Sequence, residues 1–138
     1  MLALALLALT IAWTRHQSTE EAAVRAALEH YLQGHATGDG AHHRVVFHPE
    51  SKLFWVRDGQ LMQRTSADYI AGAPGKPAPD EAQRKRRIVS VDVTGNAASA
   101  KIELDYPNAK LTDYMSLLKV GGEWKIVNKI FTPERKGR

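Results

Sequence analysis

Three of the six histidines in the chain fall within seven positions, at His42, His43 and His48. Histidines this close together suggest metal binding or acid–base chemistry. A zinc-binding pair on one helix uses residues four apart, whereas neighbouring side chains on a helix point about 100° away from each other. Pro49 also requires an extended backbone at His48. We therefore predict that these side chains go to three different places and form no metal site.

Two polar residues, Asp113 and Asn128, interrupt an apolar pattern in the C-terminal half of the chain. If the hairpins described below form, both side chains lie on a sheet face that is otherwise apolar. A carboxylate in such a place is unstable unless it is paired, hydrogen-bonded or protonated. Asp113 therefore belongs either to a buried structural network or to a functional site, and the sequence leaves both interpretations open.

The composition limits the classes of function. A chain of 138 residues with 43% hydrophobic and 25% charged residues is typical of one soluble domain. The net charge of +4 comes largely from two basic runs, residues 84–87 and 135–138. Neither run contains an aromatic residue or a recognition motif, so we expect no nucleic-acid partner. The absence of cysteine excludes disulfides, thiolate catalysis and cysteine-ligated zinc.

The N-terminus resembles an export signal. Its first thirteen residues carry no charged side chain, a length that is short for a membrane span but typical of a signal peptide. No Lys or Arg precedes this apolar run, so an uncleaved anchor or a helix folded onto the domain stays open. We predict a leader over residues 1–17, an exported domain without a membrane span over 18–133, and a basic tail over 134–138.

Helices are predicted in the N-terminal half. Ser18 and Glu21 form a capping box before a helix with an apolar stripe that ends at Gly34. A second, short helix begins after Asp39, and Ser66 is expected to cap a third. Residues 52–63 predict a hairpin with its turn at residues 58–59, and residues 73–79 form a loop rich in proline and glycine.

The C-terminal half predicts antiparallel sheet, with hairpin turns at residues 95–96 and 121–122. Two-residue turns place Lys119 opposite Trp124 and Met115 opposite Asn128, and a four-residue link at 107–110 places Leu104 opposite Asp113. Apart from Lys119, Asn128 and Asp113, one face is then apolar, and the other face is polar and wet. The predicted inner face consists of Val89, Val91, Val93, Ala98, Ala100, Ile102, Leu104, Tyr106, Leu111, Met115, Leu117, Trp124, Ile126 and Ile130.

Four segments carry a resemblance to a known family. They are "YLQGHATGD" (31–39), "FHPESKLFWVRDGQL" (47–61), "VDVTGNAASAKI" (91–102) and "DYMSLLKVGGEWKIVNKIF" (113–131). Together they resemble the nuclear transport factor 2-like (SnoaL-like) superfamily, and within it the bacterial branch called putative lumazine-binding. The resemblance implies an α+β cone-shaped roll, in which N-terminal helices pack on the concave face of a curved antiparallel sheet. It also implies a pocket between helices and sheet, and often a homodimer.

The resemblance says less about chemistry, since the superfamily includes ketosteroid isomerase, scytalone dehydratase, polyketide cyclases and members without known activity. By position, Asp113 lies where its enzymes place pocket acids, and Tyr31 lies where some place a tyrosine donor. Asp39 resembles a helix cap and not the base of the isomerase. His43 occupies a usually apolar position, so we expect it to face inward.

The leading hypothesis is an exported protein that binds a small apolar or aromatic molecule, without a cofactor. Asp113 and Asn128 would orient the ligand, and Tyr31 and His43 would donate hydrogen bonds. The remaining candidate lining residues are Trp55, Tyr69, Tyr106 and Met115. A second hypothesis is an isomerase, dehydratase or cyclase in which Asp113 transfers a proton. A third is a non-catalytic module that dimerises or docks through its outer sheet face.

Overall fold

The computed structural model describes residues 2–137, and a six-stranded curved sheet dominates it. The helices are α1 (Leu2–Thr37), α2 (Gly40–Val46), α3 (Ser66–Ala71) and the 3₁₀ turn η1 (Glu81–Gln83). The strands are β1 (Phe47–Arg57), β2 (Gln60–Thr65), β3 (Lys85–Thr94), β4 (Ala97–Asp105), β5 (Ala109–Val120) and β6 (Glu123–Arg135). The predicted α+β fold class is confirmed.

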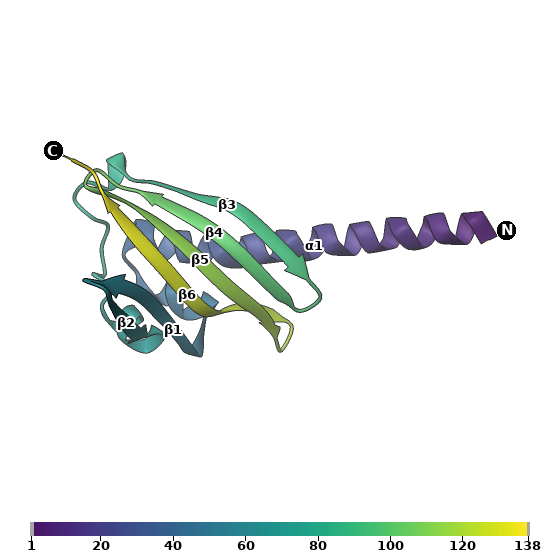
Figure 1. The fold of residues 1–138 in the computed structure, drawn as a ribbon, viewed down its shortest axis with the longest axis horizontal. Coiled ribbons are helices and arrows are strands. Elements are labelled where there is room, and N and C mark those ends of the chain that lie inside the picture. The colour runs from purple at the N-terminus through teal and green to yellow at the C-terminus, as the bar shows by residue number, and fades with distance from the viewer. Residues whose placement is uncertain (1, 138) are drawn as a thin grey trace.

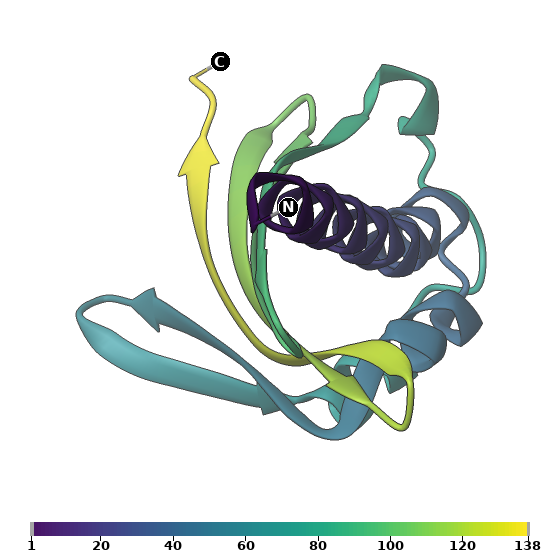
Figure 2. The same cartoon turned by 90° about the vertical axis from the view of Figure 1, so that its right-hand side faces the viewer.

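The sheet has the strand order β2-β1-β6-β5-β4-β3. Neighbouring strands are antiparallel except β1 and β6, which pair in parallel, so the sheet is mixed. Figure 1 shows the strands crossing α1, and Figure 2, viewed along α1, shows the sheet curving around that helix without closing. The concave face is therefore covered by α1, and this arrangement matches the predicted cone.

Helix α1 runs without a break from Leu2 to Thr37, so the predicted helix start at the Ser18–Glu21 capping box is wrong. The leucine- and alanine-rich segment before Ser18 has a high helix propensity and extends the helix backwards. Gly34 does not end the helix either. The end lies at Gly38, which has φ 71° and donates its N–H to the carbonyl of Gly34 at 3.0 Å.

The N-terminal part of α1 extends beyond the sheet (Figure 1). No helix in the described part of the chain combines the length and apolar character of a membrane span. Cleavage of the leader and export of the domain stay predictions.

The caps of the two short helices follow local side-chain chemistry. Asp39 caps α2 as predicted, and its Oδ1 accepts a hydrogen bond from the Ala41 N–H at 2.8 Å. The predicted Ser66 cap of α3 is wrong, since Thr65 performs this role. Ser66 is instead buried, and its hydroxyl donates to the carbonyl of His48 at 3.2 Å. The hairpin between β1 and β2 forms as predicted.

The predicted register holds near the two hairpin turns, where Val91 pairs with Ala100 and Lys119 pairs with Trp124. It fails farther along β6, where a bulge adds one residue. Met115 therefore pairs with Lys129 instead of Asn128. Because side chains alternate along a strand, this single residue turns Lys129 inward and Asn128 to the opposite face.

A second bulge follows Ile88 on β3 and makes the inward placement of Val89 wrong. Ile88 packs against the core, whereas Val89 is 38% exposed. The link between β4 and β5 is also shorter than predicted, and Ile102 instead of Leu104 pairs with Asp113. This last shift is two residues, so Asp113 keeps its inward orientation.

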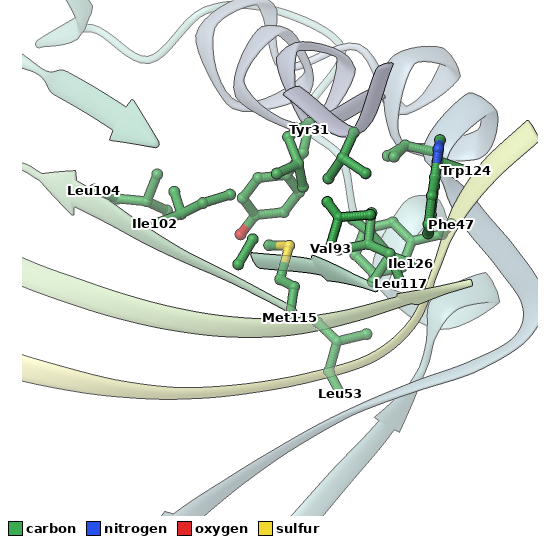
Figure 3. Packing of buried hydrophobic residues seen from close by; sticks show 14 residues of the cluster. Tyr31, Phe47, Leu53, Val93, Ile102, Leu104, Met115, Leu117, Trp124 and Ile126 are labelled. Carbon is green, nitrogen blue, oxygen red and sulfur yellow. The ribbon is translucent and has the colours of Figure 1, made fainter. Parts of the chain in front are cut away.

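The hydrophobic core lies between α1 and the concave face of the sheet. Figure 3 shows Tyr31 reaching from the helix towards the strands, with Met115 beneath its ring and Ile102 beside it. The outer face is less polar than predicted, since Tyr114 and Ile130 pair with each other there and are each 48% exposed. The third hypothesis, a non-catalytic module that docks through this outer face, stays a prediction.

Candidate functional site in the cone

A buried polar cluster joins α1 to two neighbouring strands. Its members are Tyr31 of α1, Asp113 of β5 and Lys129 of β6, each at most 3% exposed. The Tyr31 hydroxyl donates to Asp113 Oδ2 at 2.5 Å, and Lys129 Nζ donates to the Tyr31 hydroxyl oxygen at 2.5 Å. Lys129 Nζ also lies 3.3 Å from Asp113 Oδ2. We call these three residues the inner cluster.

The sequence pattern places two of the three members without difficulty. Tyr31 follows Val24 and Leu28 on one face of α1, at spacings that keep all three side chains against the sheet. Asp113 shares its side of β5 with Met115 and Leu117. Only Lys129 depends on the β6 bulge, because without this bulge the alternation along β6 would place Lys129 on the outer face.

Lys129 is surrounded by aromatic rings as well as by its hydrogen-bonding partners. Its Nζ lies 4.9 Å from the ring centroids of Tyr31 and Phe131 and 5.4 Å from that of Tyr69. Burial lowers the pKa of Lys129, and the Asp113 charge opposes this effect. Burial, with Tyr69 and the Asp113 carboxylate beside it, raises the pKa of Tyr31 well above its usual value. The Tyr31 hydroxyl therefore stays protonated at neutral pH and acts as a hydrogen-bond donor.

Asp113 keeps one oxygen unused. Its Oδ1 is buried and has no hydrogen-bond partner among the described residues. Leaving a buried polar atom unpaired costs about 1–3 kcal/mol, so such atoms call for an explanation. A purely structural ion pair would be more stable with both oxygens satisfied, and the free oxygen makes Asp113 available as a proton acceptor.

His43 faces inward as predicted, with 4% exposure. Its Nε2 lies 3.2 Å from the backbone carbonyl of Tyr31, so this nitrogen carries the proton and donates it. Burial lowers the pKa of His43 to about 4, and the ring is neutral at pH 7. His43 and Asp113 thus contact opposite ends of Tyr31, the backbone and the hydroxyl.

His35 and Tyr69 form a second polar pair. The Tyr69 hydroxyl and His35 Nε2 lie 2.9 Å apart, within hydrogen-bonding distance. Burial and the nearby positive charge of Lys129 hold the pKa of His35 well below its usual value, and burial raises that of Tyr69. Both groups are therefore neutral at pH 7. Nothing in the sequence singled out His35, because a helical histidine beside apolar residues has no distinctive spacing.

A cavity of about 420 Å³ opens beside the inner cluster. The side chains of Lys129, His35 and Tyr69 form its polar inner part, and Leu53, Trp55, Val56, Leu104, Leu111, Phe131 and Pro133 supply apolar walls. The Trp55 and Phe131 rings lie 5.4 Å apart with an interplanar angle of 31°. Asp113 has no exposed surface and lies behind Lys129, which contacts both the acid and the cavity.

Three arginines complete this lining, at Arg57, Arg64 and Arg135. Within residues 2–137, none of the three forms an ion pair, and no carboxylate joins them in the lining. Together with Lys129 they give the cavity four basic groups. A cleft with one sign of charge and apolar walls attracts ligands of the opposite charge.

A smaller cavity of about 210 Å³ adjoins the first, and His35, Arg64 and Tyr69 border both. His43 lines this smaller cavity together with backbone-rich positions such as Gly34 and Gly38. The predicted proline- and glycine-rich loop at residues 73–79 contributes part of its wall.

The other predicted site residues are dispersed. Trp55 and Tyr69 line the main cavity, whereas Met115 is packed in the core with 2% exposure. Tyr106 is held elsewhere, with its hydroxyl accepting a hydrogen bond from Arg86 Nε at 3.2 Å. Asn128 lies on the opposite side of β6 from Lys129, so its predicted place beside Asp113 is wrong.

The remaining histidines do not converge on a site. The His48 ring accepts a hydrogen bond from the Glu50 N–H at 3.2 Å, and His42 lies 5.9 Å from His30, centroid to centroid. Within the described residues, no group of three or more histidine, aspartate or glutamate side chains is arranged to hold a metal ion.

Comparison with known proteins relates this geometry to a family. Residues 19–132 match the family model described as "Putative lumazine-binding". An NTF2-like protein of unknown function from Shewanella baltica is 28% identical and has a TM-score of 0.77, covering 86% of this chain and 97% of its own. A similar protein from Silicibacter pomeroyi is 24% identical with a TM-score of 0.74, covering 85% and 98%.

One curated relative has a named activity. The aldolase FrzH of a Cladobotryum species is 23% identical over 114 residues, which are 83% of this chain and 91% of the relative. The family model spans most of the chain, and the structural neighbours share the curved sheet and its covering helix. The chain therefore belongs to the "Putative lumazine-binding" family of the NTF2-like superfamily.

Proposed function

We propose that the protein binds a small anionic molecule with an apolar or aromatic body in the main cavity. The observation that carries this proposal is the lining, in which four basic groups and apolar walls occur without a carboxylate. The sequence hypothesis of a small apolar or aromatic ligand is thereby extended to include a negative charge. Lys129, Tyr69 and His35 supply the hydrogen-bonding groups at the inner end.

Fluorescence of Trp55 provides a direct test, because this side chain lines the cavity. We expect aromatic carboxylates such as phenyllactate and cinnamate to change the emission, and to bind at least about tenfold more tightly than the corresponding amides. A charge-assisted hydrogen bond contributes about 1.5–3 kcal/mol, which corresponds to this ratio or more. Lumazine, which the family description names, belongs in the same panel.

Two matched variants distinguish binding in the cavity from nonspecific attraction of anions by positive charge on the surface. Arg64→Gln should weaken carboxylate binding, since Arg64 borders both cavities. Arg44→Gln removes the same charge from an exposed residue of α2 outside the main cavity and should bind like the wild type. Equal affinity for the carboxylates and their amides, or equal effects of the two variants, would contradict the proposal.

A second candidate function is proton transfer next to a carbonyl group. Two observations favour it: the unpaired Oδ1 of Asp113 in the inner cluster, and the aldolase name of the FrzH relative. Aldol chemistry requires removal of a proton from carbon beside a carbonyl. Asp113 does not line the cavity, so it would accept this proton through Lys129, which contacts both the acid and the cavity. This is the sequence hypothesis of an acid–base enzyme, with Lys129 added.

Exchange of carbon-bound protons tests this candidate without knowledge of the natural substrate. In D₂O, the protein should accelerate deuterium incorporation beside the carbonyl of 2-oxo acids, as followed by NMR. Asp113→Asn keeps the shape of the side chain but removes the acceptor, and should abolish the acceleration. If Asp113→Asn exchanges as fast as the wild type, Asp113 is not the base.

A further inference from the structure

Lys129 combines two properties that rarely occur together in one lysine. It lines the main cavity, yet the whole residue is only 3% exposed. Among the described residues it is the single lysine that is buried. Its amine therefore contacts Tyr31 and Asp113 instead of bulk solvent. A molecule in the cavity can nevertheless reach this amine.

Building on the ligand site proposed above, we propose that Lys129 is a nucleophile that forms an imine with an anionic ketone or aldehyde. The geometry points to this chemistry because the amine lies between a cavity and a carboxylate, with Asp113 Oδ2 at 3.3 Å from Nζ. Covalent catalysis by lysine needs an amine that can lose its proton in an apolar site. The substrate class is then a 2-oxo acid or a related carbonyl compound.

Two opposing effects act on the protonation of the Lys129 amine. Burial lowers the pKa of Lys129, while the Asp113 charge keeps the proton in place at rest. An incoming carboxylate, held by arginines such as Arg57 and Arg64, displaces water from the cavity. The raised pKa of Tyr31 keeps its hydroxyl protonated, so Tyr31 remains a hydrogen-bond donor throughout.

The proposed reaction is balanced within the inner cluster. The ammonium group of Lys129 gives one proton to Asp113, and the amine lone pair forms the C–N bond while the carbonyl π electrons move to oxygen. One proton then moves from nitrogen to this oxygen and gives a carbinolamine. Asp113 returns its proton to the new hydroxyl, water leaves with the C–O bonding electrons, and the nitrogen lone pair completes a protonated imine.

Reductive trapping tests the proposal on the wild-type full chain. The protein is incubated with phenylpyruvate and sodium cyanoborohydride, and the secondary amine formed is located by mass spectrometry of peptides. We expect Lys129 to carry at least about tenfold more adduct than exposed Lys52 and Lys76, since the proposed ligand site holds the carbonyl compound next to the Lys129 amine. Labelling that follows surface exposure, or no label on Lys129, would overturn the proposal.

Two controls distinguish a failure of the imine proposal from a failure of the binding proposal. Lys129→Arg retains a cation beside Asp113 but cannot form an imine, so the adduct at this position should disappear while the surface lysines stay labelled. Phenyllactate has a hydroxyl in place of the ketone and reports binding alone through Trp55 fluorescence. If phenyllactate binds and phenylpyruvate leaves Lys129 unlabelled, the site stands and its covalent chemistry is wrong. If phenyllactate also fails to bind, the ligand site itself is wrong.

Discussion

Helix α1 is joined to β5 and β6 by two polar clusters that each contain a lysine–carboxylate pair, one partly exposed to water and one buried. At the wet end, Glu20 of α1 accepts hydrogen bonds from Lys119 Nζ at 2.8 Å and from Trp124 Nε1 at 3.0 Å. We call these three residues the outer cluster. The inner cluster joins the same three elements, with its carboxylate and lysine on the two strands.

The two clusters differ mainly in their access to water. In the outer pair the lysine side chain is 33% exposed and the glutamate side chain 14%, whereas the corresponding values in the inner pair are 4% and 0%. Hydrogen bonds from Lys119 and Trp124 lower the pKa of Glu20 and keep it ionised. Solvent can compensate each outer charge if its partner is lost, but the inner charges depend on each other. Similar chemical groups therefore serve as a surface anchor in one place and as a candidate reaction site in the other.

The largest predicted effect is the loss of one inner charge. Asp113→Ala leaves the Lys129 ammonium buried without its counter-ion, so we expect the free energy of unfolding to fall by roughly 3–5 kcal/mol. Glu20→Ala should have a much smaller effect, because water replaces the lost partner of Lys119. Urea denaturation followed by far-UV circular dichroism measures both variants. Similar losses in the two variants would remove the distinction between the clusters.

A double replacement sharpens this test. Asp113→Leu with Lys129→Met removes both charges and retains roughly the same volume, and such replacements of buried ion pairs are often neutral or stabilising. We expect the double variant to be more stable than Asp113→Ala, and to bind no carbonyl compound covalently. A double variant as unstable as the single one would show that packing, and not charge, limits the stability of this region.

The second predicted effect is a change in the free energy of unfolding with pH. The native state keeps His43 neutral down to a pKa of about 4, whereas in the unfolded chain it takes up a proton near 6.5. The unfolded state therefore binds more protons between these values, and the free energy of unfolding falls as pH is lowered from 6.5 to 4. His43 alone accounts for about 3 kcal/mol of this loss, at 1.36 kcal/mol per pKa unit. The lowered pKa of His35 acts in the same direction.

Thermal melting at several pH values checks this dependence. His43→Gln should give a flatter stability profile between pH 6.5 and 4, even if its stability at pH 7 is lower. The matched control is His16→Gln, which changes an exposed histidine near the outer cluster and should retain the wild-type slope. Identical slopes in His43→Gln and the wild type would show that His43 takes up its proton at the same pH in the native and unfolded states.

Much of the fold could be predicted from local rules. Apolar spacing, the Asp39 cap and the glycine turns identified α2 and the hairpins of the sheet. The start of α1 could not be predicted from its capping box, because the box lies inside a segment that is helical on both sides. The bulges on β3 and β6 also left no clear signal, since one extra residue in a strand is decided by packing across the sheet.

The same limit explains the partial prediction of the candidate site. Asp113 was identified as a polar residue on an apolar face. Its predicted inward orientation is correct although the predicted register between β4 and β5 is wrong by two residues. Lys129 was missed because a one-residue bulge reverses the alternation on which the prediction relied. The clue in the sequence was that Asp113 had no cationic partner on the predicted inner face apart from Lys119 near the turn. The need of a buried carboxylate for such a partner argues against the predicted register near Asn128.

A smaller, steric effect is expected at Gly34, next to the inner cluster. A Cβ atom built there would lie 2.3 Å from Nε2 of His43, whose ring is buried. Gly34→Ala must therefore displace His43 from the Tyr31 carbonyl, and overpacking of this kind costs about 1–3 kcal/mol. Gly72→Ala is the matched control, since its Cβ would meet only ordinary contacts from 3.5 Å. If Gly34→Ala is as stable as Gly72→Ala in urea denaturation, the contact with His43 is not rigid.

The smallest effect concerns the outer cluster and its response to salt. Screening shortens the range of exposed charges to about 3 Å at 1 M ionic strength, whereas buried charges are screened much less. The stability difference between the wild type and Glu20→Gln should therefore shrink as sodium chloride rises from 0.05 M to 1 M. The difference between the wild type and Asp113→Asn should change little over the same range, because neither inner charge faces the solvent. A salt-independent difference for Glu20→Gln would mean that Glu20 acts mainly through its hydrogen bond with Trp124 and not through its charge pair with Lys119. In that case the response to salt would not distinguish the two clusters, and the contrast between them would rest on the cavity beside Lys129.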